Sequence, residues 1–370
     1  MDFVKALAVF LGTIIGVGIF GLPFTAYKTG FPIVIFYFIL MVSIVIWLDL
    51  IYGEVVLASK KNNRLPGHVK EYLGEKWKKI SFGVILVGLN GALLSYLIIG
   101  GEFLNSFFGP FLGGNSLLYS LLFFIVGAYL IFKGIKSIAG VEIFLLFVLL
   151  VILAVLFVKT FSFVDFNKFD DFDLDYLFFP YGVVLFSLWG ATLIPEIKEI
   201  VNGSRPVLRK VIVSGVIISG LIYLLFIFIV LGASRPVVSE EAFSGMGLAL
   251  GNNIIKLGFI FGVVTCFTSF ITLGLTLKKV FWCDFGFSKN IAWILTCFPA
   301  LILFLLGLRQ FIKIISFTGS VALGMEGMII VFLYQKFLKE KFAKSLNPIF
   351  YFPIGIFILG LSLEIFYFFW

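Results

Sequence analysis

Long apolar runs recur along almost the whole chain, separated by short segments that hold most of the charged residues. A run of roughly 18 or more apolar residues is long enough to cross the hydrocarbon core of a bilayer as a helix. Of the 370 residues, 61% are hydrophobic and only 13% are charged. A soluble domain has about 25% charged residues, so this chain has too few for a water-facing surface. The pattern therefore predicts an all-α integral membrane protein.

The apolar runs predict about eleven membrane-spanning helices. We expect these helices over residues 4–27, 32–57, 80–108, 117–132, 138–160, 176–197, 208–232, 256–280, 291–307, 311–334 and 348–369. The spans and their short loops use up the whole length, so residues 1–370 are expected to form a single transmembrane domain.

The basic residues are concentrated in alternate loops. If the N-terminus is cytoplasmic, the loops on that side hold 21 of the 28 Lys and Arg residues, and five aspartates lie between residues 165 and 175 on the other side. The positive-inside rule then predicts a multi-pass protein of the plasma or inner membrane, with a cytoplasmic N-terminus and an external C-terminus. The net charge of +8 forms no single basic patch, so we expect lipid and not nucleic acid as the surroundings.

An enzymatic function is not favoured. His68, the only histidine, lies in the first basic loop beside Lys70 and Glu71, and we expect it to be solvated. Chemistry within a membrane usually needs clustered acids, histidines or metal ligands at that depth. The sequence has no such cluster, so we predict that the protein is not an enzyme.

The first apolar segment is rich in residues that weaken a helix. Gly12, Gly16, Gly18, Gly21 and Pro23 fall within thirteen residues. A glycine in a helix interior costs about 1 kcal/mol and a proline about 3 kcal/mol. A broken helix at membrane depth is tolerated only where the freed backbone lines a cavity or is buried in protein. Close packing through small residues is the alternative, but this density of glycine favours a functional break.

The sixth segment carries a similar interruption. Gly190 precedes Pro195 by five residues, as Gly18 precedes Pro23. Paired interruptions in corresponding helices are typical of transporters built from inverted repeats, with the binding site near the bilayer midplane. The two five-helix repeats would comprise residues 4–160 and 176–334, with a peripheral eleventh helix at 348–369.

The two interruptions predict a site for a zwitterion. Unpaired N–H groups in the first break can bind an anionic group, helped by the positive end of the following half-helix. Carbonyls freed in the second break can accept hydrogen bonds from a cation. An amino acid has both groups on neighbouring atoms. The candidate substrate-binding residues are Gly16, Val17, Gly18, Phe186, Ser187 and Gly190.

The eighth segment has a polar face. Thr265, Thr268, Ser269 and Thr272 follow the spacing i, i+3, i+4 and i+7, which places them on one side of a helix. Their hydroxyls can bond back to carbonyls of their own helix. They can equally supply oxygen ligands to a small cation such as Na⁺, completed by carbonyls of a broken helix. The spacing alone leaves both open.

Three segments together resemble the hydroxy/aromatic amino acid permease family of the amino acid/polyamine/organocation superfamily. They are residues 12–23, 189–196 and 268–275, and the resemblance covers nearly the whole chain in helix order. It implies a leucine-transporter-like fold and secondary active transport of amino acids by alternating access. Helices 1, 2, 6 and 7 of that fold rock against helices 3, 4, 8 and 9.

The resemblance also implies roles for individual residues. The substrate carboxylate would meet Gly16 and Gly18, the amine would meet carbonyls near Phe186 and Ser187, and Phe186 would be a gating aromatic. Ile19 stands where some sodium-coupled relatives have an asparagine, so their first sodium site is not expected. A single Na⁺ site would comprise the carbonyls of Gly12 and Ile15 with Thr265, Thr268 and Ser269.

Two carboxylates are candidates for proton coupling. Glu102 lies in the third expected helix and Glu326 in the tenth. Ionisable residues inside a membrane usually have a function, although a structural hydrogen bond is the alternative for both. We expect no cofactor apart from Na⁺ or H⁺ as the coupling ion.

Other functions are also compatible with the sequence. Within transport, the alternative is an exchanger or a carrier of amines. Outside it, the alternatives are an ion channel, which would not need paired helix breaks, and a membrane-embedded enzyme. The sequence does not determine which amino acid is carried, which ion drives it, or the oligomeric state.

Overall fold

The computed structural model describes residues 2–59, 63–134, 139–169, 172–234, 237–345 and 347–369. Nearly all of these residues are helical, and an isolated bridge between Gly30 and Phe172 is the only β pairing among them. A helix satisfies its backbone polar groups within one segment, as hydrocarbon requires. The predicted all-α membrane fold is therefore confirmed.

The helices follow the expected spans closely. They are α1 (Asp2–Ile14), α2 (Gly18–Thr29), α3 (Phe31–Ala58), α4 (Leu65–Leu73), α5 (Glu75–Leu112), α6 (Ser116–Lys133), α7 (Ala139–Thr160), α8 (Pro180–Leu188), α9 (Ile194–Ile200), α10 (Arg205–Ala233), α11 (Gly247–Lys279), α12 (Lys289–Leu305), α13 (Phe311–Phe317), α14 (Gly324–Phe342) and α15 (Phe352–Phe369). The short helix α4 lies in the first basic loop and was not expected.

Within the described residues, seven helical units are long and apolar enough to cross a membrane, and the bent pair α1–α2 makes an eighth. Two shorter apolar helices, α12 and α15, match the expected spans 291–307 and 348–369. The remaining expected span, 176–197, is divided between α8 and α9, which have nine and seven residues.

Three spans are interrupted in the part of the chain that the structure describes. α1 and α2 are bent by 51° at their break, and a 3₁₀ turn over Ala191–Leu193 separates α8 from α9. Both interruptions were predicted from glycine and proline. The third, a π-helical segment over Thr318–Leu323 between α13 and α14, was not. Such π segments inside longer helices often occur at functional sites.

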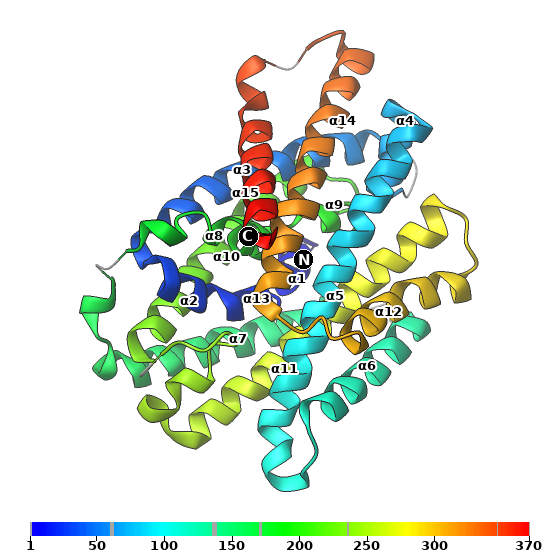
Figure 1. Cartoon of the computed structure of the whole chain (residues 1–370). Coiled ribbons are helices and arrows are strands. Elements are labelled where there is room, and N and C mark those ends of the chain that lie inside the picture. Colours follow the sequence, from blue (N-terminus) through cyan, green and yellow to red (C-terminus); the bar gives the residue numbers. More distant parts are fainter. Residues whose placement is uncertain are drawn as a thin grey trace.

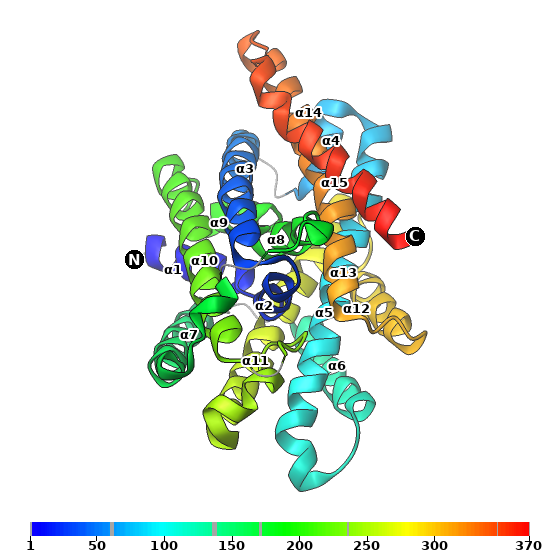
Figure 2. The same ribbon diagram turned by 60° about the vertical axis from the view of Figure 1, so that its left-hand side comes forward.

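The helices are arranged around the breaks (Figure 1), and Figure 2 shows α2 near the centre of the molecule, with α8 on one side of it and α11 on the other. One group of helices, α1, α2, α3, α8 and α10, packs together around the breaks. A second group, α5, α6, α11 and α12, packs against it. At the outer edge of the first break, Phe20 of α2 lies with its ring centroid 4.9 Å from that of Phe103 in α5. The breaks therefore lie where the two groups meet.

Candidate functional site

The first break interrupts the hydrogen-bond ladder of its span. The regular pattern ends where Ile15 N–H donates to the Leu11 carbonyl at 2.8 Å, and Gly16 N–H turns back to Ile14 at 2.7 Å. The ladder resumes with a longer bond of 3.4 Å from Ile19 N–H to the Gly16 carbonyl. The first N–H groups of a helix have no partner within it, so the start of α2 presents donors to the centre of the bundle.

The second break releases carbonyl groups from α8. Trp189 leaves the helix with extended backbone angles, φ −69° and ψ 113°. Its N–H reaches the Phe186 carbonyl at 3.4 Å, and Leu193 N–H donates to the Gly190 carbonyl at 3.0 Å in the short turn that follows. The carbonyl of Ser187 is thus left outside the helical ladder and faces another helix.

That helix is α10, which joins the two breaks through Tyr223. The Tyr223 hydroxyl lies 2.6 Å from the carbonyl oxygen of Ile14 and 2.8 Å from that of Ser187. Its side chain is completely buried. The two breaks also touch directly, because a Cβ atom added to Gly18 would lie only 2.9 Å from the Ser187 Cα. A glycine is therefore required at position 18.

A cavity opens beside the joined breaks, between the two groups of helices. The breaks contribute Thr13, Ile14, Gly18, Phe186, Ser187, Trp189, Thr192 and Leu193, and the other walls are Gly88, Leu89, Ala92, Tyr96, Leu273 and Leu323. Three of the six predicted substrate-binding residues, Gly18, Phe186 and Ser187, line this cavity.

The other three predicted substrate residues lie next to the cavity. Gly16 contacts the Tyr96 hydroxyl so closely that an added Cβ would overlap it, and that hydroxyl also interacts with the backbone of Val17. Gly190 packs against Phe10 and Asp49. The six residues are thus brought together at the two breaks, and their contacts with a substrate remain predictions.

Several residues of the cavity and of the joined breaks carry no sequence signal of their own. Gly88 and Ala92 are one turn apart in α5 and give the cavity a wall without bulky side chains. Tyr223 and Thr192 are ordinary polar residues in apolar segments. Only their position against the breaks, which depends on helix packing, identifies them.

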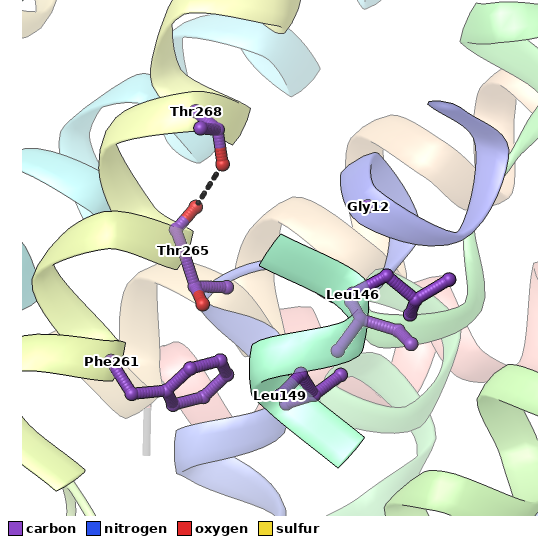
Figure 3. A pocket seen from close by; sticks show the side chains of 7 residues that line it. Gly12, Leu146, Leu149, Phe261, Thr265 and Thr268 are labelled. Atoms are coloured by element: carbon purple, nitrogen blue, oxygen red, sulfur yellow. Dashed lines mark hydrogen bonds between the residues drawn. The ribbon is translucent and has the colours of Figure 1, made fainter. Parts of the chain in front are cut away.

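A second, smaller cavity lies where the cation site was predicted (Figure 3). It is lined by Gly12, Ile15, Thr265 and Thr268, together with the apolar side chains Leu146, Leu149 and Phe261. Ser269 lies close by, and its hydroxyl donates to the Gly12 carbonyl at 3.2 Å. All five predicted residues are thus brought together from α1, the break and α11.

The chemistry of this second cavity fits a hard cation. Its polar groups are hydroxyl and backbone carbonyl oxygens, the ligand type that small hard cations prefer. The Thr268 hydroxyl donates to the carbonyls of Val264 at 3.2 Å and Thr265 at 3.1 Å. The Thr268 hydroxyl therefore bonds back to carbonyls of its own helix. The hydroxyl oxygens retain lone pairs, so cation binding at this place stays a prediction.

The two candidate coupling carboxylates have different surroundings. Glu326, at the start of α14, is 3% exposed and lies beside Trp189 of the second break. Glu102, in α5, interacts instead with Glu241 and Glu240, which precede α11. Only Glu326 therefore lies next to a break.

Charged residues close the bundle at the end where α4 lies, which we call the α4 end. Arg64 pairs with Glu196 at 2.8 Å, and its side chain is 3% exposed. Lys279 approaches the same carboxylate at 3.5 Å. Lys198, two residues after Glu196, donates to the carbonyls of Val56 at 2.8 Å and Ser59 at 2.7 Å. These contacts tie α9 to α3, to α11 and to the segment that precedes α4.

The expectation that His68 is solvated is wrong. α4 folds back on the bundle, which leaves His68 fully buried with its ring centroid 6.0 Å from that of Tyr52. Burial, together with the positive charges of Lys198 and Arg64, lowers the pKa of His68 to about 3. His68 is therefore a neutral packing residue at neutral pH.

Solved structures share this arrangement. The chain is similar over 99% of its length to MhsT in complex with L-phenylalanine (97% of that chain, 16% identity, TM-score 0.72). It is also similar over 98% to a manganese transporter of Eremococcus coleocola (85% of that chain, 9% identity, TM-score 0.73). The transporter Mhp1 of the nucleobase-cation-symport-1 family matches over 97% (89% of that chain, 13% identity, TM-score 0.68).

These structural matches establish the fold, which is that of leucine-transporter-like secondary transporters, although the sequence identities are low. No curated protein matches the chain in sequence. Residues 1–347, which include both breaks and both cavities, match the model of one family. The chain belongs to the tryptophan/tyrosine permease family of membrane transporters.

Proposed function

We propose that the protein carries an amino acid with an aromatic side chain across the cell membrane by alternating access, coupled to the entry of a cation. The observation that carries the proposal is the cavity between two broken helices, whose walls come from both groups of helices. We further propose membership of the amino acid/polyamine/organocation superfamily, a cytoplasmic N-terminus, and transport without covalent chemistry.

The broken backbones supply the two polar contacts that an amino acid needs. The N–H groups at the start of α2, near Gly18, would bind the carboxylate, and the positive end of that helix favours a negative charge. Carbonyls at the end of α8, near Phe186 and Ser187, would accept from the ammonium group. Tyr223 holds the two breaks at a fixed separation, so both contacts are available to one small molecule.

The remaining walls favour a flat, apolar side chain. Phe186 and Trp189 contribute aromatic residues to the lining, and Gly88 and Ala92 contribute no bulky side chain to it. Aromatic rings stack favourably on one another. The family includes tryptophan and tyrosine permeases, and the similar structure of MhsT contains L-phenylalanine. We therefore propose L-tryptophan, L-tyrosine and L-phenylalanine as the first ligands.

Alternating access follows from the position of the cavity. Gly18 and Phe186 belong to the group of α1, α2, α3, α8 and α10, whereas Ala92 and Leu273 belong to the group of α5, α6, α11 and α12. Rocking one group against the other would open the cavity to one side at a time. Phe20 and the network around Arg64 are the contacts that would separate at either end.

The coupling cation has two candidate locations. Na⁺ would be held by the carbonyls of Gly12 and Ile15 with the hydroxyls of Thr265, Thr268 and Ser269. There it would neutralise carbonyl dipoles at the first break and favour the bent form. A proton would be held by a carboxylate, and Glu326 is the predicted one that lies next to a break.

The test is ligand-induced thermal stabilisation of the purified protein. Each of the twenty amino acids is added with Na⁺ or with K⁺, at neutral and at acidic pH. A ligand at 100 times its dissociation constant stabilises a protein by about 2.7 kcal/mol. We expect stabilisation by aromatic amino acids and none by glutamate or lysine.

A matched pair of variants locates the effect. Phe186→Ala removes a cavity wall and should weaken the shift given by L-tryptophan, whereas Phe82→Ala, which removes a ring packed on Phe285, should leave it unchanged. Stabilisation by charged amino acids alone would contradict the substrate class. The absence of a shift with any amino acid would contradict the proposed function.

A further inference from the structure

Asp49, in the middle of α3, is a buried carboxyl that the proposed transport cycle has not used. Its side chain is completely buried, and neither of its carboxyl oxygens has a hydrogen-bond partner among the residues that the structure describes. A buried charge without hydrogen bonds or a counter-ion is strongly unfavourable. Asp49 therefore needs a bound proton or another cation that neutralises its carboxylate.

A second buried carboxyl lies on the neighbouring helix α14. Glu326, which is 3% exposed, is the charged side chain that acts electrostatically on Asp49. The helices meet here, since an added Cβ at Gly327 would lie 3.3 Å from Leu48 Cδ1. No lysine, arginine or histidine acts on either carboxyl among the described groups. Two like charges in one buried place cannot both persist, so such pairs share a proton.

The pair touches the second helix break. A Cβ atom added to Gly190 would lie 2.8 Å from Asp49 Oδ2, so this carboxyl lies against the backbone of the break. Trp189, whose side chain lines the substrate cavity, lies beside Glu326. A change of charge on the pair would therefore act on the turn that shapes the cavity.

A polar side chain connects the pair with the α4 end. Tyr52 is one turn from Asp49 on α3, is 1% exposed, and interacts with Glu326. It also interacts with Asp284, Arg64 and Glu196 of the network at the α4 end. Its hydroxyl has no hydrogen-bond partner within the described part of the chain. A phenol can pass a proton between the pair and the charged network once its hydroxyl rotates to form a hydrogen bond on each side.

We propose that Asp49 and Glu326 together form the binding site for a coupling proton. With the proton bound, the pair carries at most one negative charge, and the second break keeps the form that lines the cavity. Loss of the proton towards the α4 end, through Tyr52, leaves two negative charges beside the Gly190 backbone and displaces that turn. This deepens the proposed function, on which it rests, by choosing a proton as the coupling ion.

The test uses proteoliposomes and radiolabelled L-tryptophan in Na⁺-free buffer. With one proton per substrate, an inward gradient of one pH unit supports about tenfold accumulation, because one unit corresponds to about 1.4 kcal/mol. Wild type should approach this ratio. Glu326→Gln and Asp49→Asn, which mimic the protonated form, should lose accumulation but retain exchange of L-tryptophan across the vesicle membrane.

Glu364→Gln is the matched control. Glu364 is another carboxyl on an apolar helix, but its oxygen accepts hydrogen bonds from Ser316 at 2.9 Å and Ser320 at 3.1 Å. This variant should accumulate L-tryptophan as wild type does. Normal pH-driven accumulation by Glu326→Gln would overturn the proposal, as would wild-type accumulation that follows a Na⁺ gradient and ignores the pH gradient.

Two further measurements cover the remaining outcomes. If the variants do not fold, a pH-sensitive dye trapped in wild-type vesicles should report acidification during L-tryptophan uptake, and the absence of acidification would overturn the proposal.

If wild type exchanges no amino acid, the proposed function fails, but the proton site is still testable by infrared spectroscopy. A protonated carboxylic acid band present at neutral pH in wild type and in Glu364→Gln, and diminished in the Asp49→Asn, Glu326→Gln double variant, supports the site. An unchanged band contradicts it.

Discussion

The hydroxyl of Tyr223 lies 2.6 Å from the carbonyl oxygen of Ile14, the last residue of α1 before the break. The same hydroxyl lies 2.8 Å from the Ser187 carbonyl in the second break. A side chain of α10 thereby links two interruptions that are far apart in the sequence. Each carbonyl lies where its helix ends, so neither has a regular helical partner.

Tyr223→Phe should destabilise the protein by about 1–3 kcal/mol, because it leaves buried carbonyls unsatisfied. It should also weaken L-tryptophan binding, since the two breaks lose their common contact. Thermal melting and ligand-induced stabilisation measure both effects. Tyr119→Phe is the control, because that hydroxyl donates to Gly113 at 2.7 Å, outside the cavity. Equal effects of the two variants on binding would contradict this role of Tyr223.

Gly18→Ala should abolish L-tryptophan binding and lower the melting temperature. The added methyl would meet the Ser187 backbone, so α2 and α8 must separate. Gly83→Ala, in α5, adds a methyl group that has no neighbour within 4 Å beyond its own stretch of helix backbone, and it should be neutral or slightly stabilising. Wild-type binding by Gly18→Ala would remove the contact between the breaks from the proposed site.

Arg64→Gln should destabilise the closed α4 end, because it leaves Glu196 without its closest partner. Breaking a buried ion pair costs about 3–5 kcal/mol. The cavity should then become more accessible from this end. To detect this, the three native cysteines are replaced and Thr192→Cys is introduced. A water-soluble thiol reagent should then label the new cysteine faster. Arg205→Gln breaks an ion pair with Glu54 in which Arg205 is 60% exposed, so a small effect is expected. Unchanged labelling of Thr192→Cys in Arg64→Gln would contradict a closing role for Arg64.

His68→Phe should remove part of the loss of stability in acid. The pKa of His68 is about 3 in the folded protein, against about 6.5 in an unfolded chain. The unfolded state therefore binds more protons below about pH 6.5, and stability falls as the pH decreases from 6.5 towards 3. This group contributes a slope of about 1.4 kcal/mol per pH unit over that window. Thermal melting of wild type and variant at about pH 7 and pH 5 measures the difference. If the stability of both proteins changed equally between these pH values, His68 would not be buried in solution.

The positions of the spans and of two breaks could be predicted because their signals are local. Apolar length determines where a helix can cross, and the glycine and proline at Gly18, Pro23, Gly190 and Pro195 weaken the helix wherever it packs. The expected ranges and the observed helices accordingly differ mainly by a few residues at their ends. Gly18, Phe186 and Ser187, which line the cavity, could be selected for the same reason, since they lie in or beside those breaks.

Other features are decided by which helix faces meet. The link from Tyr223 to Ile14, the approach of Asp49 to the Gly190 backbone, and the burial of His68 each depend on residues from different elements. In a soluble protein, a polar face and an apolar face would indicate these orientations. Helices in a bilayer are apolar towards lipid and towards protein alike, so periodicity does not reveal the buried face. The sequence by itself determined where the chain crosses and where it breaks, and the tertiary packing decided which polar groups meet at those breaks.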